Sequence, residues 1–182
     1  MAQALLIVDI QNDYFPGGRM ELAGAEQAAE NARKVLEHFR ANGLPVIHIQ
    51  HIALQPTATF FLPGTAGAEI HPSVKPLAGE TVFQKHYPSA FRDTPLLENL
   101  KAQGITELVV VGMMTHMCVD TTVRAAFDLG FKCTVIHDAC ATRTLSFAEV
   151  SVPPEQVHAS YIAALGAVFA QPRSAQEWIA AQ

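Results

Sequence analysis

Short apolar runs alternate with segments of helical periodicity along the whole chain. The runs predict strands, most of which are buried on both faces because no polar position interrupts them. The predicted strands cover residues 4–8, 45–49, 81–85, 107–112 and 132–137. Between them, apolar residues recur at the i, i+3, i+4 spacing of an amphipathic helix, most clearly from Ala28 to Phe39. Further helices are predicted over residues 94–103, 119–130 and 155–165.

The C-terminal part adds two short elements to this pattern. Residues 167–170 predict a short sixth strand. Ser174 and Glu177 have the spacing of a capping box, which opens a final helix around Trp178. Residues 53–79 are rich in Pro, Gly and Thr and predict a loop. A loop of this length inside a compact domain is usually either functional or disordered.

Repeated strand–helix–strand units with apolar strands are typical of a parallel sheet covered by helices on both faces. We therefore expect an α/β fold, with the 182 residues forming one domain over positions 1–182. Ligands of such sheets bind outside the carboxyl ends of the strands, at the point where the strand order reverses. Reactive side chains that directly follow a strand are therefore the candidates for chemistry.

Composition narrows the function classes. Apolar residues make up 49% of the chain and charged residues 16%, which excludes a disordered chain. The net charge of −5 argues against a nucleic-acid or anionic-membrane partner, since such binders carry basic surfaces. No apolar stretch approaches the roughly eighteen residues of a membrane span, and no basic leader precedes residues 4–8. We expect a cytoplasmic protein that acts on a small molecule.

Three side chains that could take part in catalysis lie at or after the ends of predicted strands: Asp9, Lys85 and Cys118. Each also has a plain structural explanation. Asp9 can cap the following loop, Lys85 can reach solvent along its stem, and Cys118 can be a small buried hydrophobe. Together they supply a carboxylate, an ammonium and a thiol at one edge of the sheet, the groups that nucleophilic catalysis uses. Spacing alone does not show how Lys85, from the third strand, would reach the other two.

Cys118 differs from Cys133 and Cys140 in its predicted surroundings. An odd count of three cysteines argues against a disulfide framework. Cys118 falls in the first turn of a helix after a strand, where free N–H groups and the helix dipole are expected to lower the pKa of a thiol. The same N–H groups can receive an oxyanion. Cys133 and Cys140 have no such activating neighbours and are interpreted as core residues.

Four segments resemble the isochorismatase-like cysteine hydrolases, a family that includes nicotinamidases, N-carbamoylsarcosine amidases, ureidoacrylate-type amidohydrolases and isochorismatases. They are Ala4–Phe15, Phe61–His71, the lysine segment Lys85–Thr94, and Val111–Val119 with Thr122 and Arg124. The matches follow the family's order from residue 4 to about residue 142.

The resemblance implies a three-layer α-β-α fold with a six-stranded parallel sheet in the order 3-2-1-4-5-6. It implies the catalytic triad Asp9, Lys85 and Cys118, and an oxyanion hole formed by the backbone N–H groups of Met114 and Cys118. It also implies a cis peptide between Met113 and Met114, and a homo-oligomer, either a dimer or a tetramer. Because Cys118 is present, we expect hydrolysis of an amide-type C–N bond through a thioester. The alternative is the vinyl-ether cleavage of isochorismatases, some of which lack the cysteine.

A metal-assisted nicotinamidase is a second alternative. Nicotinamidases of the family hold a metal with an Asp-x-His motif after the second strand and further histidines. Here that region carries His48 and His51 without the Asp, and two residues three apart on a strand face opposite sides. We therefore expect no metal and no other cofactor.

The substrate pocket is predicted from aromatic and sulfur-containing side chains in loops at the carboxyl end of the sheet. These residues are Phe15, Phe60, Tyr87, Phe91, Met114 and His116. His116, inside the nucleophile turn, either contacts substrate or points to solvent. Phe83 and Phe127 lie inside predicted elements and are assigned to the core.

Two further hypotheses compete with an amidohydrolase. A thiol sensor built on Cys118 would need a low-pKa, exposed thiol but no general base, so Asp9 discriminates between the two. An assembly role would use Trp178 and the apolar last helix as a contact between copies, which is compatible with hydrolysis.

Overall fold

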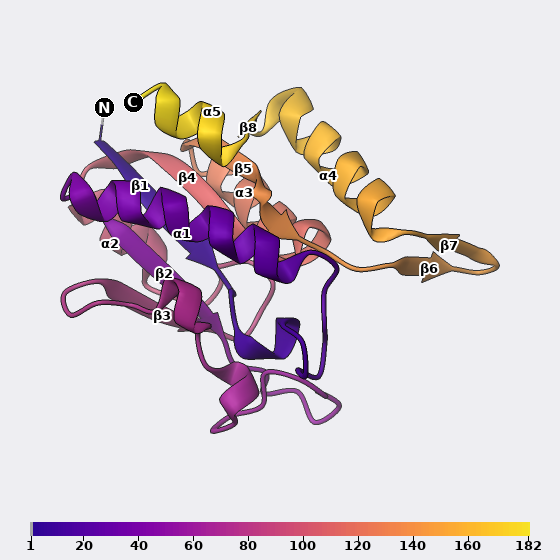
Figure 1. Ribbon diagram of the computed structural model, residues 1–182. Coiled ribbons are helices and arrows are strands. Elements are labelled where there is room, and N and C mark those ends of the chain that lie inside the picture. Colours follow the sequence, from indigo (N-terminus) through magenta and orange to yellow (C-terminus); the bar gives the residue numbers. More distant parts are fainter. Residues whose placement is uncertain (1) are drawn as a thin grey trace.

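The computed structural model describes residues 2–182 and contains a parallel six-stranded sheet (Figure 1). Its strands are β1 (Ala2–Val8), β2 (Val46–His51), β3 (Thr81–Lys85), β4 (Ile105–Met113), β5 (Lys132–Ala141) and β8 (Gln171–Arg173). They lie in the order β3-β2-β1-β4-β5-β8, and every neighbouring pair is parallel. Counted within the sheet, this is the predicted order 3-2-1-4-5-6.

Helices cover both faces of the sheet, as expected for a three-layer α-β-α fold (Figure 1). On one face, α1 (Ala25–Ala41) and α5 (Ala175–Ala180) pack over a core that includes Leu5 and Ile7. On the other face, α2 (Leu96–Ala102), α3 (Asp120–Asp128) and α4 (Pro154–Val168) cover a core that includes Leu6 and Val8. The uninterrupted apolar strands therefore serve both cores, with successive side chains pointing to opposite faces.

Gly112 permits the close approach of β1 and β4 at the switch point, where the strand order reverses. Its φ is 136°, and a Cβ there would lie 2.0 Å from the Val8 carbonyl oxygen. The pairing of β4 with β5 is irregular between Val110 and Gly112. This glycine, the last small residue before the turn that carries Cys118, lets that turn start directly beside the end of β1.

The C-terminal third differs from the sequence prediction in two ways. The last strand of the sheet is Gln171–Arg173, whereas residues 167–168 belong to α4. The alanine-rich end of α4 continues the helix, which ends with the Phe169 N–H bonded to the Leu165 carbonyl. A two-stranded antiparallel hairpin, β6 (Leu145–Phe147) with β7 (Val150–Val152), was not predicted, and it projects away from the body (Figure 1).

Two aromatic residues also differ from expectation. Trp178 is 6% exposed and stacks on Phe39 of α1 with ring centroids 5.3 Å apart, so it fastens α5 to α1. Trp178 therefore has little exposed surface left for a contact between copies, and the homo-oligomer stays a prediction. Phe127 was assigned to the core but is 40% exposed at the surface of α3. Within residues 2–182, no helix is long and apolar enough to cross a membrane.

Candidate active site

The structure brings Asp9, Lys85 and Cys118 together at the carboxyl ends of the central strands. The Lys85 Nζ lies 2.7 Å from Asp9 Oδ2 and 3.3 Å from the Cys118 Sγ. It also lies 2.8 Å from His51 Nδ1 and donates to the Tyr87 carbonyl at 3.0 Å. The ammonium is thus the centre of the cluster, in contact with the carboxylate, the thiol and an imidazole.

Each of the three side chains reaches the cluster from a different element. Asp9 directly follows β1 and has a φ of 50°, in the left-handed region that Asp tolerates better than most residues. Cys118 lies in a π-helical turn, Thr115–Val119, between β4 and α3. Lys85 ends β3, beside His51 of β2, and its long side chain passes the end of β2 to reach Asp9. Lys85 thus reaches Asp9 although β3 and β1 are separated by β2 in the sheet.

A hydrogen bond ties the lysine segment to the nucleophile segment. The Ala90 N–H donates to Thr122 Oγ1 of α3 at 3.0 Å, and both residues are fully buried. Two of the family-like sequence segments are therefore joined in space, and the segment after Lys85 is held against the helix that follows Cys118.

The cluster is almost fully buried. Asp9 and Lys85 are 0% exposed and Cys118 is 5% exposed. Asp9 Oδ1 has no hydrogen-bond partner within residues 2–182. A buried carboxylate oxygen without a donor is costly, and it lies beside a thiol that can supply a proton. Ligand atoms of Asp9 and Cys118 lie within 4.8 Å of each other.

The Cys118 thiol differs from expectation in its pKa. Burial raises this pKa, and the negative charge of Asp9 raises it further, while Lys85 lowers it by less. The thiol is therefore protonated at rest, contrary to the prediction that its helix terminus lowers the pKa. Burial alone would lower the pKa of Lys85, but Asp9 and Cys118 raise it above its ordinary value. The lysine is a permanent cation here, and the thiol needs a base to become a nucleophile.

His51 is part of the cluster and was missed as a site residue. Burial, followed by the charge of Lys85, lowers its pKa to about 4, so the imidazole is neutral at neutral pH. Its Nδ1 accepts the hydrogen bond from Lys85 and the proton is on Nε2. In the sequence, His51 is a polar residue near the end of an apolar strand, as Asp9 and Lys85 are. The prediction treated His51 only as a possible metal ligand.

Three side chains of the cluster are of the types that bind metal ions. Asp9, His51 and Cys118 offer an oxygen, a nitrogen and a sulfur within 4.8 Å of one another, a set that suits zinc. The Lys85 ammonium already contacts all three of these side chains, so a cation occupies the place that a metal would take. His48 faces the other way, is 1% exposed and binds Glu80 at 2.8 Å. The residues present do not fit a metal centre while Lys85 is charged.

The nucleophile turn has the implied backbone. The Met113–Met114 peptide is cis, as the resemblance implied. The Met114 carbonyl accepts from the N–H groups of Met117 and Val119, at 3.0 and 3.3 Å, which closes the turn. Thr115 Oγ1 donates to the Ala141 carbonyl at 3.2 Å and thereby fixes the turn against β5. The oxyanion hole at the N–H groups of Met114 and Cys118 stays a prediction.

The predicted pocket residues have different surroundings. Phe15 stacks on His71 with ring centroids 3.6 Å apart, and the half-buried Phe60 lies beside Tyr14. Arg92 lies over the ring of Tyr87, 3.5 Å from its centroid.

Phe91 packs against Phe131, in the core on the α2–α4 face of the sheet. His116 is 7% exposed and bonds Thr142 Oγ1 at 2.5 Å through Nδ1, so it does not point to solvent. Met114 is buried next to the cis peptide. The wall of the pocket stays a prediction for these residues.

Tyr14 was not singled out from the sequence and lies against the site. It is 1% exposed, and its ring contacts Phe61 edge-on at 4.6 Å. Burial raises the pKa of its hydroxyl, and the charges of Cys118 and Asp9 raise it further, so it stays protonated. Tyr14 lies in a short turn after β1, where no periodicity in the sequence indicates which side chains face the site.

Buried polar residues hold the long loop over the site. Gln11 Nε2 donates to the carbonyls of His51 and Ala68, at 2.8 and 2.7 Å. Asp13 accepts the Phe61 N–H at 2.7 Å and the Arg19 N–H at 3.2 Å. Residues 61 and 68 of the long loop are thereby fixed beside the segment that follows β1.

A parallel α/β sheet with acid, ammonium and thiol at its carboxyl edge is suited to nucleophilic chemistry on a small molecule. The sequence comparison is specific: the isochorismatase domain family model matches residues 3–177. The chain belongs to the isochorismatase family.

Individual relatives agree with this assignment. The chain is 51% identical over 179 residues to the uncharacterized isochorismatase family protein YddQ of Bacillus subtilis (strain 168), covering 98% of this chain and 99% of that protein. A solved isochorismatase hydrolase structure from Oleispira antarctica has a TM-score of 0.95 and 50% identity, covering 98% and 96% of the two chains. N-carbamoylsarcosine amidase from Thermoplasma acidophilum has a TM-score of 0.83 and 29% identity, covering 97% and 98%.

Proposed function

We propose that the protein is a cysteine-dependent hydrolase that cleaves an amide-type C–N bond of a small molecule through a thioester intermediate. The observation that carries this proposal is the contact of one buried ammonium, Lys85, with both Asp9 and Cys118. The similarity to an N-carbamoylsarcosine amidase supports the choice of an amide-type bond.

The first half of the reaction forms the thioester. Asp9 takes the thiol proton of Cys118, and the resulting thiolate attacks the carbonyl carbon. The carbonyl oxygen becomes an oxyanion, which the N–H groups of Met114 and Cys118 are proposed to bind. Asp9 then gives its proton to the leaving nitrogen as the C–N bond breaks. The Lys85 ammonium stays charged and stabilises whichever partner carries the negative charge.

The second half releases the acid. Asp9 takes a proton from water while the water oxygen attacks the thioester carbonyl. The tetrahedral intermediate collapses, the C–S bond breaks, and the Cys118 thiolate regains its proton from Asp9. The raised pKa of Cys118 explains why a base is needed at all, since a thiol that is protonated at rest cannot attack unaided.

The same features weigh against a thiol sensor. A redox sensor needs an exposed thiol of low pKa, whereas Cys118 is 5% exposed and burial raises its pKa. A vinyl-ether hydrolase that works without a cysteine would have no use for this arrangement. A metal-assisted amidase of the nicotinamidase kind is disfavoured because the segment around His48 and His51 lacks the Asp of the Asp-x-His motif.

The test is a panel of nicotinamide, N-carbamoylsarcosine and other small amides, with isochorismate as the vinyl ether. Ammonia or amine release measures C–N cleavage. Cys118→Ala and Asp9→Asn are expected to lose turnover of any amide that the native protein hydrolyses, and Cys133→Ala, which removes a buried thiol elsewhere, is expected to keep it. A mass increment on Cys118 with a slow substrate would support the thioester. Undiminished turnover by Cys118→Ala would overturn the proposal.

A further inference from the structure

Helix α4 contacts the turn that carries Cys118 through two side chains of its N-terminal half. His158 Nδ1 lies 3.0 Å from Thr115 Oγ1. The ring of Tyr161 meets the ring of His116 edge-on, with centroids 6.0 Å apart. Because His158 and Tyr161 are three residues apart, they lie on one face of the helix. That face of α4 covers the nucleophile turn.

The Thr115 hydroxyl is a buried junction between α4 and the sheet. Its oxygen has two neighbours, His158 Nδ1 and the Ala141 carbonyl, which lies at 3.2 Å. A hydroxyl has one hydrogen to donate and a carbonyl can only accept, so the hydroxyl donates to Ala141. His158 Nδ1 must then donate to the hydroxyl oxygen. The hydrogen bonds run one way, from the imidazole through the hydroxyl to the carbonyl of β5.

The protonation state of His158 agrees with this direction. Burial lowers the pKa of its imidazole and the charge of His137 lowers it further, while a hydrogen bond with the His137 backbone acts the other way. His158 is therefore neutral at neutral pH, and a neutral imidazole has one N–H and one bare nitrogen. The single N–H is the one at Nδ1 that the Thr115 oxygen accepts.

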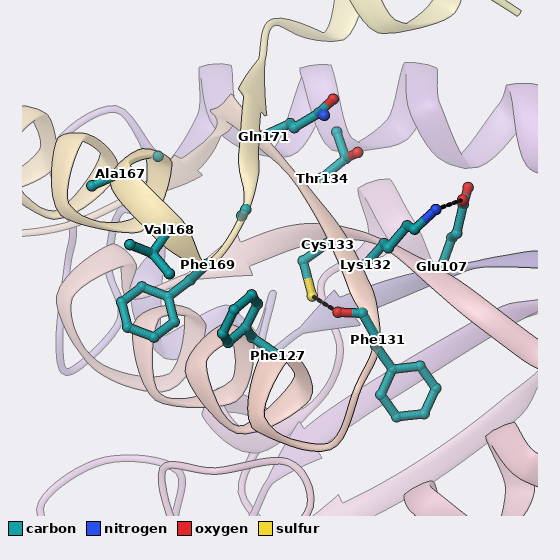
Figure 2. Close-up of a pocket in the computed structure, with 12 residues that line it drawn as sticks. Glu107, Phe127, Phe131, Lys132, Cys133, Thr134, Ala167, Val168, Phe169 and Gln171 are labelled. Carbon is teal, nitrogen blue, oxygen red and sulfur yellow. Dashed lines mark hydrogen bonds and ion pairs between the residues drawn. The ribbon is translucent and has the colours of Figure 1, made fainter.

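The other end of α4 is fixed to α3, the helix that follows the nucleophile turn. Phe169 comes directly after α4 and packs edge-on against Phe127 of α3, with ring centroids 5.3 Å apart. Figure 2 shows these two rings next to each other at the end of α4. The Arg124 guanidinium lies over the Phe169 ring, 4.4 Å from its centroid, and Leu165 is fully buried. The helix that presents His158 to the turn is therefore held firmly in place.

Thr115 lies between the two backbone donors of the proposed oxyanion hole. It directly follows Met114 and precedes Cys118 by three residues. Such donors stabilise an oxyanion only when they are held where it forms. An interaction made in the transition state, and not with the bound substrate, changes kcat rather than KM. A hydrogen bond that fixes Thr115 is therefore expected to act on kcat.

We propose that His158 is a positioning residue of the reaction, which holds the nucleophile turn in its productive geometry by donating a hydrogen bond from Nδ1 to Thr115. This inference rests on the proposed function, because it concerns the same thiol and the same oxyanion donors. His158 acts from α4 and through Thr115, so it needs no contact with the substrate.

Steady-state kinetics on an amide that the native protein hydrolyses give the first test. In His158→Leu, kcat is expected to fall about 3- to 10-fold, the effect of one neutral hydrogen bond, while KM changes by less than about 2-fold. His158→Asn places an amide N–H near the position of Nδ1 and is expected to recover most of the loss. Ser160→Leu puts the same side chain at an exposed position of α4 and is expected to leave kcat unchanged. Unchanged kcat in His158→Leu, or a loss confined to KM, would overturn the proposal.

A double-mutant cycle tests whether the effect passes through Thr115. Thr115→Val removes the hydroxyl at nearly constant shape and is expected to lower kcat. Adding His158→Leu to it is expected to cost less than about a further 2-fold, because the hydrogen bond is already absent. Full additivity would overturn the path through Thr115. If His158→Leu does not fold, Thr115→Ser, which keeps the hydroxyl, is compared with Thr115→Val, and equal kcat values in these two variants would overturn the proposal.

Hydrogen exchange tests the same hydrogen bond without a substrate. The backbone N–H groups of residues 113–119 are expected to exchange at least about 3-fold faster in His158→Leu than in the native protein or in Ser160→Leu. Unchanged exchange would overturn the positioning role, whatever the protein hydrolyses. A native protein without amidase activity would overturn the proposed function and the kinetic role of His158, while the exchange result would still decide whether His158 holds the turn.

Discussion

His51 and Lys85 are register partners at the ends of adjacent strands, and His51 Nδ1 accepts a 2.8 Å hydrogen bond from the Lys85 ammonium. The same ammonium contacts Asp9 and Cys118. His51 therefore orients the central cation of the cluster without adding a charge of its own. This gives the imidazole a positioning role in the proposed reaction.

The role of His51 is tested by pairing two substitutions. His51→Asn keeps an acceptor oxygen near the position of Nδ1 and is expected to retain most of the turnover. His51→Leu removes the acceptor. Because a hydrogen bond to a buried charged group contributes about 1.5–3 kcal/mol, kcat is expected to fall roughly 10- to 100-fold in that variant.

His86→Ala is the matched control, since this neighbour of Lys85 bonds the Ile52 carbonyl and does not contact the ammonium. Unchanged kcat in His51→Leu would contradict the positioning role. If kcat falls as far in His51→Asn as in His51→Leu, packing of the imidazole ring is important rather than its hydrogen bond.

Stability is expected to fall as the pH is lowered from 7.5 to 5. Burial lowers the pKa of His51 from 6.5 to about 4, so between these values the unfolded chain binds a proton that the folded chain does not. The loss starts below the unfolded pKa, and for His51 alone it reaches about 2 kcal/mol at pH 5. Burial also lowers the pKa values of His48, His116 and His158, which act in the same direction.

Urea unfolding at pH 7.5 and pH 5 measures this loss. His51→Asn is expected to have a shallower dependence on pH than the native protein, by about the contribution of that one imidazole. Glu80 does not interfere in this window. Burial alone would raise its pKa, but Arg40, the Leu77 N–H and His48 lower it to about 2. If the free energy of unfolding changes with pH by the same amount in His51→Asn and in the native protein, His51 does not contribute to the pH dependence.

Removing the cation from the centre of the cluster is expected to create affinity for a soft divalent metal. Asp9, His51 and Cys118 then present oxygen, nitrogen and sulfur donors without a competing ammonium. Lys85→Ala is expected to bind Co²⁺ with a thiolate-to-cobalt absorption band, whereas the native protein and Lys85→Arg are expected to show none. Stoichiometric cobalt at this site in the native protein would refute the view that Lys85 takes the place of a metal.

The sheet and the three candidate catalytic residues could be predicted because each depends on local sequence. Apolar runs set the strands, and polar residues such as Asp9 after a run identify the edge that carries the site. The reach of Lys85 past β2 could not be predicted, because it depends on the path of a side chain beside His51 rather than on spacing. The raised pKa of Cys118 was missed for a similar reason: burial outweighs the favourable effect of Lys85.

Other elements were not predicted correctly because they are too short, or too uniformly apolar, to show a helical or strand periodicity in the sequence. The hairpin strands around Phe147 and Val150 have three residues each, and β8 has three as well. Helix α4 is apolar around its circumference, so its pattern does not distinguish the covered side from the exposed side. Burial of Trp178 depends on the meeting of α5 with α1, two elements far apart in the sequence.

Gly67 is expected to be intolerant of a side chain, because a Cβ there would lie 2.1 Å from Asp13 Oδ1. Asp13 holds the Phe61 and Arg19 N–H groups, so Gly67→Ala must displace the carboxylate that anchors the loop over the site. A loss of about 1–3 kcal/mol of unfolding free energy is expected, by analogy with overpacked cores. Ala66→Ser, at the exposed neighbouring position, is expected to cost little.

Combining Gly67→Ala with Asp13→Ala shows whether the loss comes from the contact between these two positions. Asp13→Ala alone removes the acceptor of both N–H groups and is expected to destabilise by a similar amount. Once the carboxylate is gone, the alanine at position 67 has nothing to displace. The losses are therefore expected to be less than additive in urea unfolding, with a coupling of at least about 0.5 kcal/mol. Strict additivity would mean that Gly67 is needed for a reason other than its contact with Asp13.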